Sequence, residues 1–204
     1  MKENKTVCLY IDTATKSLSL GAKVGDQSKT LTIADPKQAL ELTNLGIETL
    51  GKELGFALAD VDGYYCLLGP GSNTGIRLGL TIPRTVYAFN PSIKIYGILT
   101  LKLFLAEQKN AYACLSDRSG NLFLGEMNEG VYSYRKLEKT EIASLVSDRP
   151  LMAEKEDALA LEELKDYPHL VPISVIDTMM AHPELFEDFS SREEEFLPEY
   201  ALAI

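Results

Sequence analysis

Two short segments of the chain carry residue types that could contact a phosphate group. The first is residues 11–15 (IDTAT), where a carboxylate and two hydroxyls follow an apolar run. Hydroxyls and backbone amides in such a turn can ring a phosphate, and a carboxylate at a strand end can hold a metal through water. The same residue types also build an ordinary β-turn. From the sequence, both interpretations stand.

The second segment, residues 69–75 (GPGSNTG), lies between an apolar run and a stretch with helical periodicity. Glycines permit close backbone approach, and the free amides of a helix N-terminus attract anions. The segment is neither a P-loop nor a GxGxxG motif, and a tight turn with Ser72 or Thr74 as helix cap is the alternative. The predicted phosphate or nucleotide contacts are Asp12, Thr13, Thr15, Gly71, Ser72, Thr74 and Arg77.

The residues that commonly catalyse hydrolysis are not arranged for it in this sequence. The only histidines, His169 and His182, form no HxxxH or HExxH pair, and no Gly-x-Ser-x-Gly motif occurs. No cysteine has a histidine near it in sequence, and residues 193–195 (EEE) are typical of a solvated surface. We therefore predict no catalytic residues and no metal ligands, although distant residues can converge in space.

The elements that would position these segments alternate strands with helices. We predict strands over 6–11, 17–24, 28–33, 63–69 and 92–97, and helices over 39–54, 75–89 and from Thr100, as its cap, to about Lys109. Gly55 is a typical helix end. The order is βββαβαβα, which indicates an α/β fold.

The pattern begins again after this point. Residues 111–137 offer three more strands, and Asp117 follows Asp12 at a constant offset of 105 residues. This indicates a duplicated unit with a reduced second copy, because only weaker helices near 139–146 and 156–166 and a helix or loop near 177–188 follow. We predict two lobes, 1–108 and 109–204, with the tail packing back on the first lobe.

The two long helices have more apolar surface than one core can cover. In the first, one stripe contains Ala39, Leu40, Ile47, Leu50 and Leu54; in the second, it contains Ile76, Leu80 and Tyr87. Other apolar residues fall on the opposite sides. Mutual covering by the sheet and the helices is one explanation, and a surface for another subunit is the other. The predicted partner surface is Leu42, Leu45, Thr49, Leu78, Ile82 and Phe89.

Composition restricts the class of protein. The 204 residues carry a net charge of −10, which disfavours direct binding of nucleic acid. Three cysteines without CxxC spacing are typical of buried free thiols in a reducing compartment. The apolar runs are too short for a signal peptide or a membrane span. We therefore expect a cytoplasmic protein.

The motifs resemble those of one known family. Residues 11–20 (IDTATKSLSL) and 69–80 (GPGSNTGIRLGL) are similar to the patterns IDTSTxxxSVAL and GPGSFTGLRIGL of the bacterial TsaB family, also called YeaZ. The resemblance is firm over residues 6–90 and thin after about 130. Asn73, Gln38 and residues 82–85 (IPRT) depart from the family pattern, and these departures lie at or beside the predicted partner surface.

The resemblance implies an actin-like ATPase fold (ASKHA, ribonuclease H-like) with two lobes from a duplicated βββαβα unit. It also implies a non-catalytic partner of the transferase subunit TsaD. Together with the ATPase TsaE, the two proteins form threonylcarbamoyladenosine beside the anticodon of tRNA. Family members pair through the first two helices, with TsaD or with themselves. ATP or ADP at that joint would be the only cofactor, and none is expected to bind tightly.

Two other functions stay open. One is a small ATP-dependent phosphotransferase of the actin and sugar-kinase superfamily, with Asp12, Thr13 and Thr15 on the phosphates and Asp117 near the metal. The other is a peptidase, for which the sequence offers no evident metal ligand or nucleophile. The leading hypothesis is the scaffold subunit.

Overall fold

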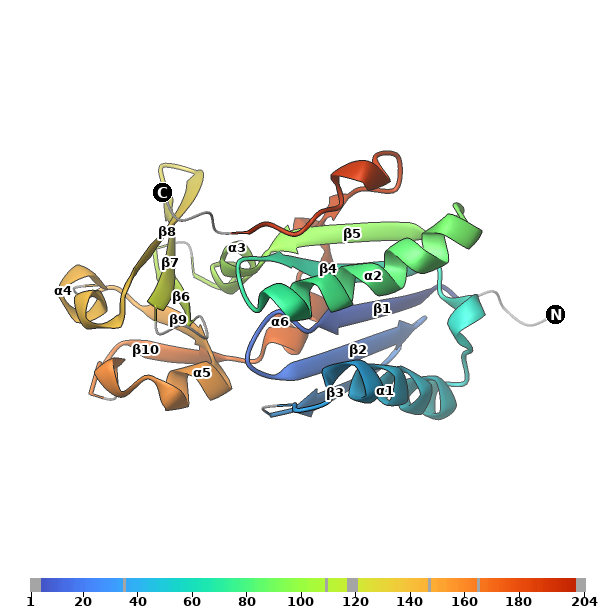
Figure 1. The fold of residues 1–204 in the computed structure, drawn as a ribbon, viewed down its shortest axis with the longest axis horizontal. Coiled ribbons are helices and arrows are strands. Elements are labelled where there is room, and N and C mark those ends of the chain that lie inside the picture. The colour runs from blue at the N-terminus through green and yellow to red at the C-terminus, as the bar shows by residue number, and fades with distance from the viewer. Residues whose placement is uncertain are drawn as a thin grey trace.

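The chain forms two mixed sheets that lie beside one another, each with helices packed against it (Figure 1). The computed structural model describes residues 5–34, 36–108, 110–116, 121–146, 148–164 and 166–200. Within these ranges no helix has both the length and the apolar character that crossing a bilayer requires.

The first sheet has the strand order β11-β5-β4-β1-β2-β3. Strand β2 is antiparallel to both of its neighbours, β1 and β3, whereas β4 and β5 run parallel to β1. Its strands are β1 (Val7–Asp12), β2 (Leu18–Val24), β3 (Gln27–Ile33), β4 (Gly63–Gly69), β5 (Lys94–Leu99) and β11 (Glu187–Asp188).

Two long helices cover one face of this sheet. Helix α1 (Ala39–Leu54) packs on β2 and β3, and α2 (Asn73–Phe89) packs on β4 and β5 (Figure 1). Gly46 brings α1 close to the sheet, because a Cβ there would lie 2.4 Å from Leu20 Cδ1. As predicted, α1 ends at Gly55, which has a φ of 76°. Of the two cap candidates in the sequence, Ser72 and Thr74, it is Ser72 that caps α2, which begins at Asn73 rather than at residue 75. A short 3-10 helix (Leu58–Asp60) follows α1.

The second sheet repeats the topology of the first. Its order, β10-β9-β6-β7-β8, corresponds strand by strand to β5-β4-β1-β2-β3. The predicted duplication is therefore confirmed, and the copy is complete in its strands. Its strands are β6 (Tyr112–Ser116), β7 (Asn121–Asn128), β8 (Val131–Glu138), β9 (Leu151–Glu154) and β10 (Leu170–Ile173); its helices are α4 (Ile142–Val146) and α5 (Lys155–Ala160), with 3-10 turns at Lys139–Glu141 and Glu162–Leu164.

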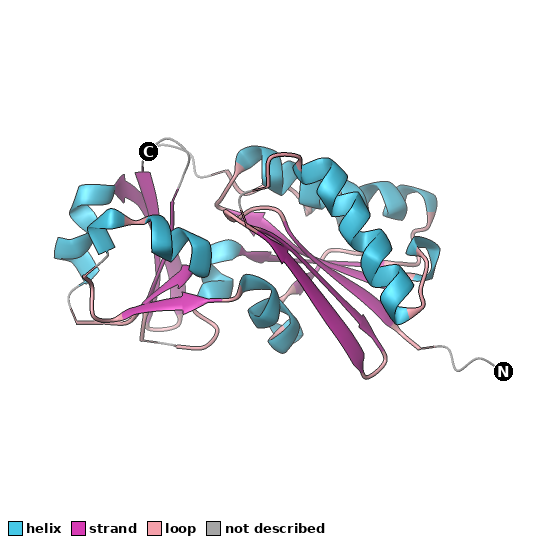
Figure 2. Ribbon diagram, turned by 90° about the horizontal axis from the view of Figure 1, so that it is seen from below, coloured by secondary structure: helices cyan, strands magenta, loops and turns pink. Residues whose placement is uncertain are grey.

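The two lobes exchange helices. Helix α3 (Thr100–Phe104) follows the first sheet in sequence and contacts β4 and β5, but it also packs on β6 and β7 of the second sheet; α6 (Val175–Ala181) follows the second sheet but packs on β1 and β2. Both contacts are made over a glycine. A Cβ on Gly21 would lie 2.5 Å from Met180 Sδ, and one on Gly125 would lie 3.0 Å from Leu101 Cβ. Since Leu20 faces α1 and successive strand residues alternate, α6 covers the opposite face of the first sheet (Figure 2).

The chain after α6 returns to the first sheet. A 3-10 turn (Pro183–Leu185) leads into β11, which is antiparallel to β5, and a second (Glu193–Glu195) follows. Phe189 and Phe196 are buried, and Glu199 N donates to Leu68 O over 2.7 Å. The tail thus packs on the first lobe as far as Tyr200, and the last four residues lie outside the described ranges.

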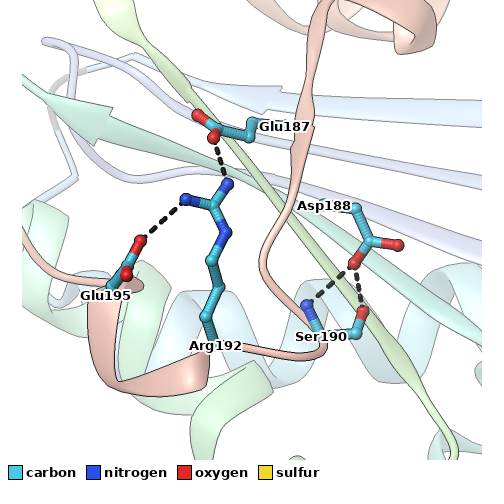
Figure 3. A network of polar contacts seen from close by, with 5 residues as sticks. All are labelled: Glu187, Asp188, Ser190, Arg192 and Glu195. Carbon is cyan, nitrogen blue, oxygen red and sulfur yellow. Dashed lines mark hydrogen bonds and ion pairs between the residues drawn. The ribbon is translucent and has the colours of Figure 1, made fainter.

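A polar network organises this returning segment (Figure 3). The Arg192 guanidinium pairs with Glu187 and, over 2.7 Å, with Glu195, while Ser190 N donates to Asp188 over 2.8 Å. The Arg192 side chain is partly exposed and its two carboxylate partners are mostly exposed, so each ion pair contributes little free energy of folding. The buried phenylalanines therefore supply most of the segment's attachment.

The structure corrects several sequence predictions. Helix α3 ends at Phe104 rather than Lys109, and Thr100 is its first residue, with no hydrogen bond to its buried hydroxyl, rather than its cap. Leu40, predicted in the core stripe of α1, is 58% exposed. Strands β9, β10 and β11 were not predicted, because four or two residues are too few to show a period.

Candidate functional site

The two predicted phosphate segments contact each other. Ser72 N donates to Ala14 O over 2.7 Å, and Thr13 Oγ1 donates to Gly75 O over 2.6 Å. A Cβ on Gly75 would lie 1.7 Å from Thr13 O, and one on Gly71 would lie 2.4 Å from Ala14 O. The glycines of the second segment are therefore required for backbone packing against the β1–β2 turn, residues 13–17.

Asp12 is directed into that turn. Its carboxylate is fully buried and accepts from Ala14 N (2.9 Å), Thr15 N (3.1 Å) and Thr15 Oγ1 (2.6 Å). Burial raises the pKa of Asp12 to about 7, the nearby charge of Glu154 also raises it, and the hydrogen bonds lower it. Asp12 thus closes the turn from within, and it does not line the adjacent pocket.

A carboxylate from the second lobe binds the other end of the turn. Glu154 Oε1 accepts from Ser17 N over 3.2 Å and from the Ser17 hydroxyl, and Oε2 accepts from Asp157 N over 3.1 Å. Burial raises the pKa of Glu154 as well. Sequence reasoning missed this residue, because a contact across 137 positions from an unpredicted strand leaves no local pattern.

A pocket of about 450 Å³ lies between the turn and the N-terminal ends of α1 and α2. Lys16, Lys37 and Arg77 line it, and no carboxylate is among its described lining residues. Arg77 Nε donates to Tyr200 Oη over 2.6 Å. Asp117 lies outside the described residues. Of the predicted phosphate contacts, the pocket is lined by Thr13, Thr15, Ser72, Thr74 and Arg77.

The side of the helix pair away from the sheet carries an exposed apolar surface. Leu45 is 58% exposed and Phe89 is 87% exposed. The remaining predicted partner residues, Leu42, Thr49, Leu78 and Ile82, are partly exposed. We call these six residues the helix-pair surface. A groove of about 650 Å³, lined in part by Phe56, Leu58 and Ile82, borders it.

The charged strip of α2 is covered differently. Arg84 Nε lies 2.6 Å from Glu193 Oε1, and Tyr87 Oη donates to Ser190 O over 2.5 Å, both in the returning C-terminal segment. The chain's own tail therefore covers the polar flank of α2 and leaves the helix-pair surface uncovered.

Within the described ranges, no three His, Cys, Asp or Glu side chains are grouped so that they could hold a metal ion. Cys66 and Cys114 are buried and Cys8 is partly exposed; all three are free thiols. Burial raises the pKa of each thiol, which disfavours the reactive thiolate. His182 lies at the surface between Glu107 (3.0 Å) and Glu184 (3.3 Å).

Comparisons with known proteins place the fold. No protein-family model matches the chain, and no curated protein matches its sequence. Among solved structures, an uncharacterized Pseudomonas aeruginosa protein with similarity to peptidase YeaZ aligns with a TM-score of 0.70, 18% identity and coverage of 96% of this chain and 99% of that one.

YeaZ from Pseudomonas aeruginosa aligns with a TM-score of 0.66, at the same identity and coverage. AlfA from the B. subtilis plasmid pLS32, in a filament, aligns with a TM-score of 0.50, 11% identity and coverage of 83% of this chain and 92% of that one. The chain therefore has the fold of YeaZ (TsaB), an actin-like ATPase fold.

Proposed function

We propose that this protein is a non-catalytic scaffold subunit of the complex that forms threonylcarbamoyladenosine in tRNA, and that it supports a TsaD-like transferase subunit. The observation that carries the proposal is the helix-pair surface. It lies on the helices through which the resembled family pairs, and it stays exposed in the folded chain.

Two side chains of the helix-pair surface would gain free energy from a partner that covers them. Burying one large apolar side chain contributes about 1.5–3 kcal/mol, and Leu45 and Phe89 are mostly in water in the monomer. When the TsaD-like subunit is absent, we propose that a second copy of the chain covers the surface.

The pocket at the N-terminal ends of α1 and α2 is the proposed site for a nucleotide. Its three cations suit an anionic ligand. We propose that ATP or ADP binds here only when a partner completes the site, so no cofactor is held tightly by the isolated protein. A TsaE-like ATPase is the third component, and tRNA contacts belong to the partners because this chain is acidic. The proposed location is the cytoplasm.

The phosphotransferase alternative has less support. It requires Asp12, Thr13 and Thr15 to face a nucleotide. Thr13 and Thr15 line the pocket, but Asp12 is buried, accepts hydrogen bonds within the β1–β2 turn and does not line it. The peptidase alternative finds no metal-holding group in the described residues. Tight binding of ATP with magnesium by the isolated chain, measured by calorimetry, would reverse this preference.

The test is co-elution with the TsaD-like subunit of the same source on a sizing column, with and without ATP. We expect a heterodimer with the unsubstituted chain and at least about tenfold weaker binding with Leu45→Glu. Leu159→Glu is the matched control, because Leu159 is 75% exposed on α5, away from the helix pair. Separate elution of the unsubstituted proteins, or equal loss in both variants, would contradict the proposal.

A further inference from the structure

The β1–β2 turn has its hydrogen-bond donors directed at an anion that belongs to the chain itself. The amide and hydroxyl of Ser17 both donate to the same oxygen, Oε1 of Glu154. An amide and a hydroxyl converging on one oxygen are the groups with which a turn binds a phosphate. Here that position is filled by a carboxylate from the other lobe.

Glu154 is well fixed for this role. It is 3% exposed, it ends β9, and it caps α5 by accepting from Asp157 N through its second oxygen. Asp157 in turn accepts from Ser116 N over 2.6 Å and from the Ser116 hydroxyl at the end of β6. Contacts within the second lobe therefore fix the position of the Glu154 carboxylate, and from that position it contacts Ser17 of the first lobe.

Within the described ranges no ion pair joins Glu154 to a cation, so hydrogen bonds alone stabilise its charge. A buried carboxylate without a cation depends strongly on its donors, because losing one leaves charge unsatisfied in a poorly polarisable interior. The contact between Ser17 and Glu154 therefore depends on the relative position of the two lobes.

We infer that Glu154 is an internal anionic ligand of the β1–β2 turn, which occupies the oxyanion position at Ser17 and thereby fastens the second lobe to the first. Neither Ser17 nor Glu154 belongs to the helix-pair surface, so this contact can be tested in the chain without a partner. One consequence is that external phosphate cannot use the Ser17 donors while Glu154 is in place.

Amide hydrogen exchange on the full chain tests the fastening. Glu154→Ala should speed exchange of the Ser17 and Asp157 amides by about tenfold or more, since both donate to Glu154. Ser17→Ala should speed exchange only on the turn, because Asp157 keeps its acceptor. Glu162→Ala, which removes an exposed charge from the same lobe, should change neither amide.

A wild-type rate at residue 17 in a folded Glu154→Ala variant would overturn the inference. If that variant does not fold, Glu154→Gln decides, since it keeps an acceptor of similar shape but loses the charge. Faster exchange at Ser17 supports the role, and unchanged protection contradicts it.

Inorganic phosphate tests the anionic part of the inference. Phosphate should shift the Ser17 amide resonance in Glu154→Ala and leave it unchanged in the unsubstituted protein and in Glu162→Ala. Equal responses in all three proteins would overturn the inference. The inference would also be overturned if the Ser17 amide in Glu154→Ala exchanged faster but its resonance did not shift with phosphate.

Discussion

The two lobes share one topology but differ in what their helices expose. Helices α1 and α2 have 16 and 17 residues, whereas α4 and α5, at the corresponding places, have five and six. A helix of one or two turns can cover a small core but cannot present a long face to a partner. The helix-pair surface is therefore found on the first lobe alone, although both lobes have a sheet of the same topology.

The largest expected effect on the free energy of unfolding is in the first lobe, at the point where the start of α2 packs directly against the backbone of the β1–β2 turn. Gly75→Ala should destabilise the fold by about 4 kcal/mol or more, because the added Cβ meets the Thr13 carbonyl at 1.7 Å. Gly130→Ala, in a hairpin turn of the second lobe with open space around it, should cost about 1 kcal/mol for its positive φ of 82°. Urea unfolding measures both, and similar costs would contradict the tight packing of the two segments.

An intermediate effect should come from Asp12 and depend on pH. Its folded pKa of about 7 lies above the usual 3.8, so the folded state binds the proton more tightly than the unfolded state does. Stability therefore falls as pH rises between these values, by roughly 2–3 kcal/mol from pH 5 to pH 8. Asp12→Asn should remove this part of the slope in urea titrations. A residual slope of the same sign is expected from Glu154, and an undiminished slope would contradict the assignment to Asp12.

The smallest effect should distinguish the two exchanged helices. Gly21→Ala and Gly125→Ala should each cost about 1–3 kcal/mol, because both place a Cβ against a helix from the other lobe. Gly125→Ala should cost more, since Leu101 Cβ is fixed to its backbone whereas the sulfur of Met180 can move. Thermal unfolding of both variants decides, and the reverse order would show that α6 is the more rigidly seated helix.

Much of the first lobe could be predicted from local signals. The long periods of α1 and α2, the helix end at Gly55 and the cap at Ser72 are all short-range features. Leu40 was misplaced because a helical period gives a direction and not the extent of the covering sheet. Leu40 lies in the first turn of α1, where the helix borders the pocket instead of the core.

The second lobe and the centre of the candidate site were harder to predict. A strand as short as β9 has no measurable alternation, and its last residue acts on a turn made much earlier in the chain. The use of Asp12 was also undecided, because the same carboxylate could close a turn or face a ligand. Only the arrangement of the surrounding amides distinguishes the two.

The exchange of α3 and α6 has a consequence during synthesis. A ribosome that has released residues 1–108 has made five strands of the first sheet but not the helix that covers its second face or the strand that borders β5. The apolar face of the first sheet that α6 covers therefore stays exposed to water until the end of the chain has been synthesised. Neither half is therefore a self-sufficient module, and a cut between them should yield two fragments that need each other in order to fold.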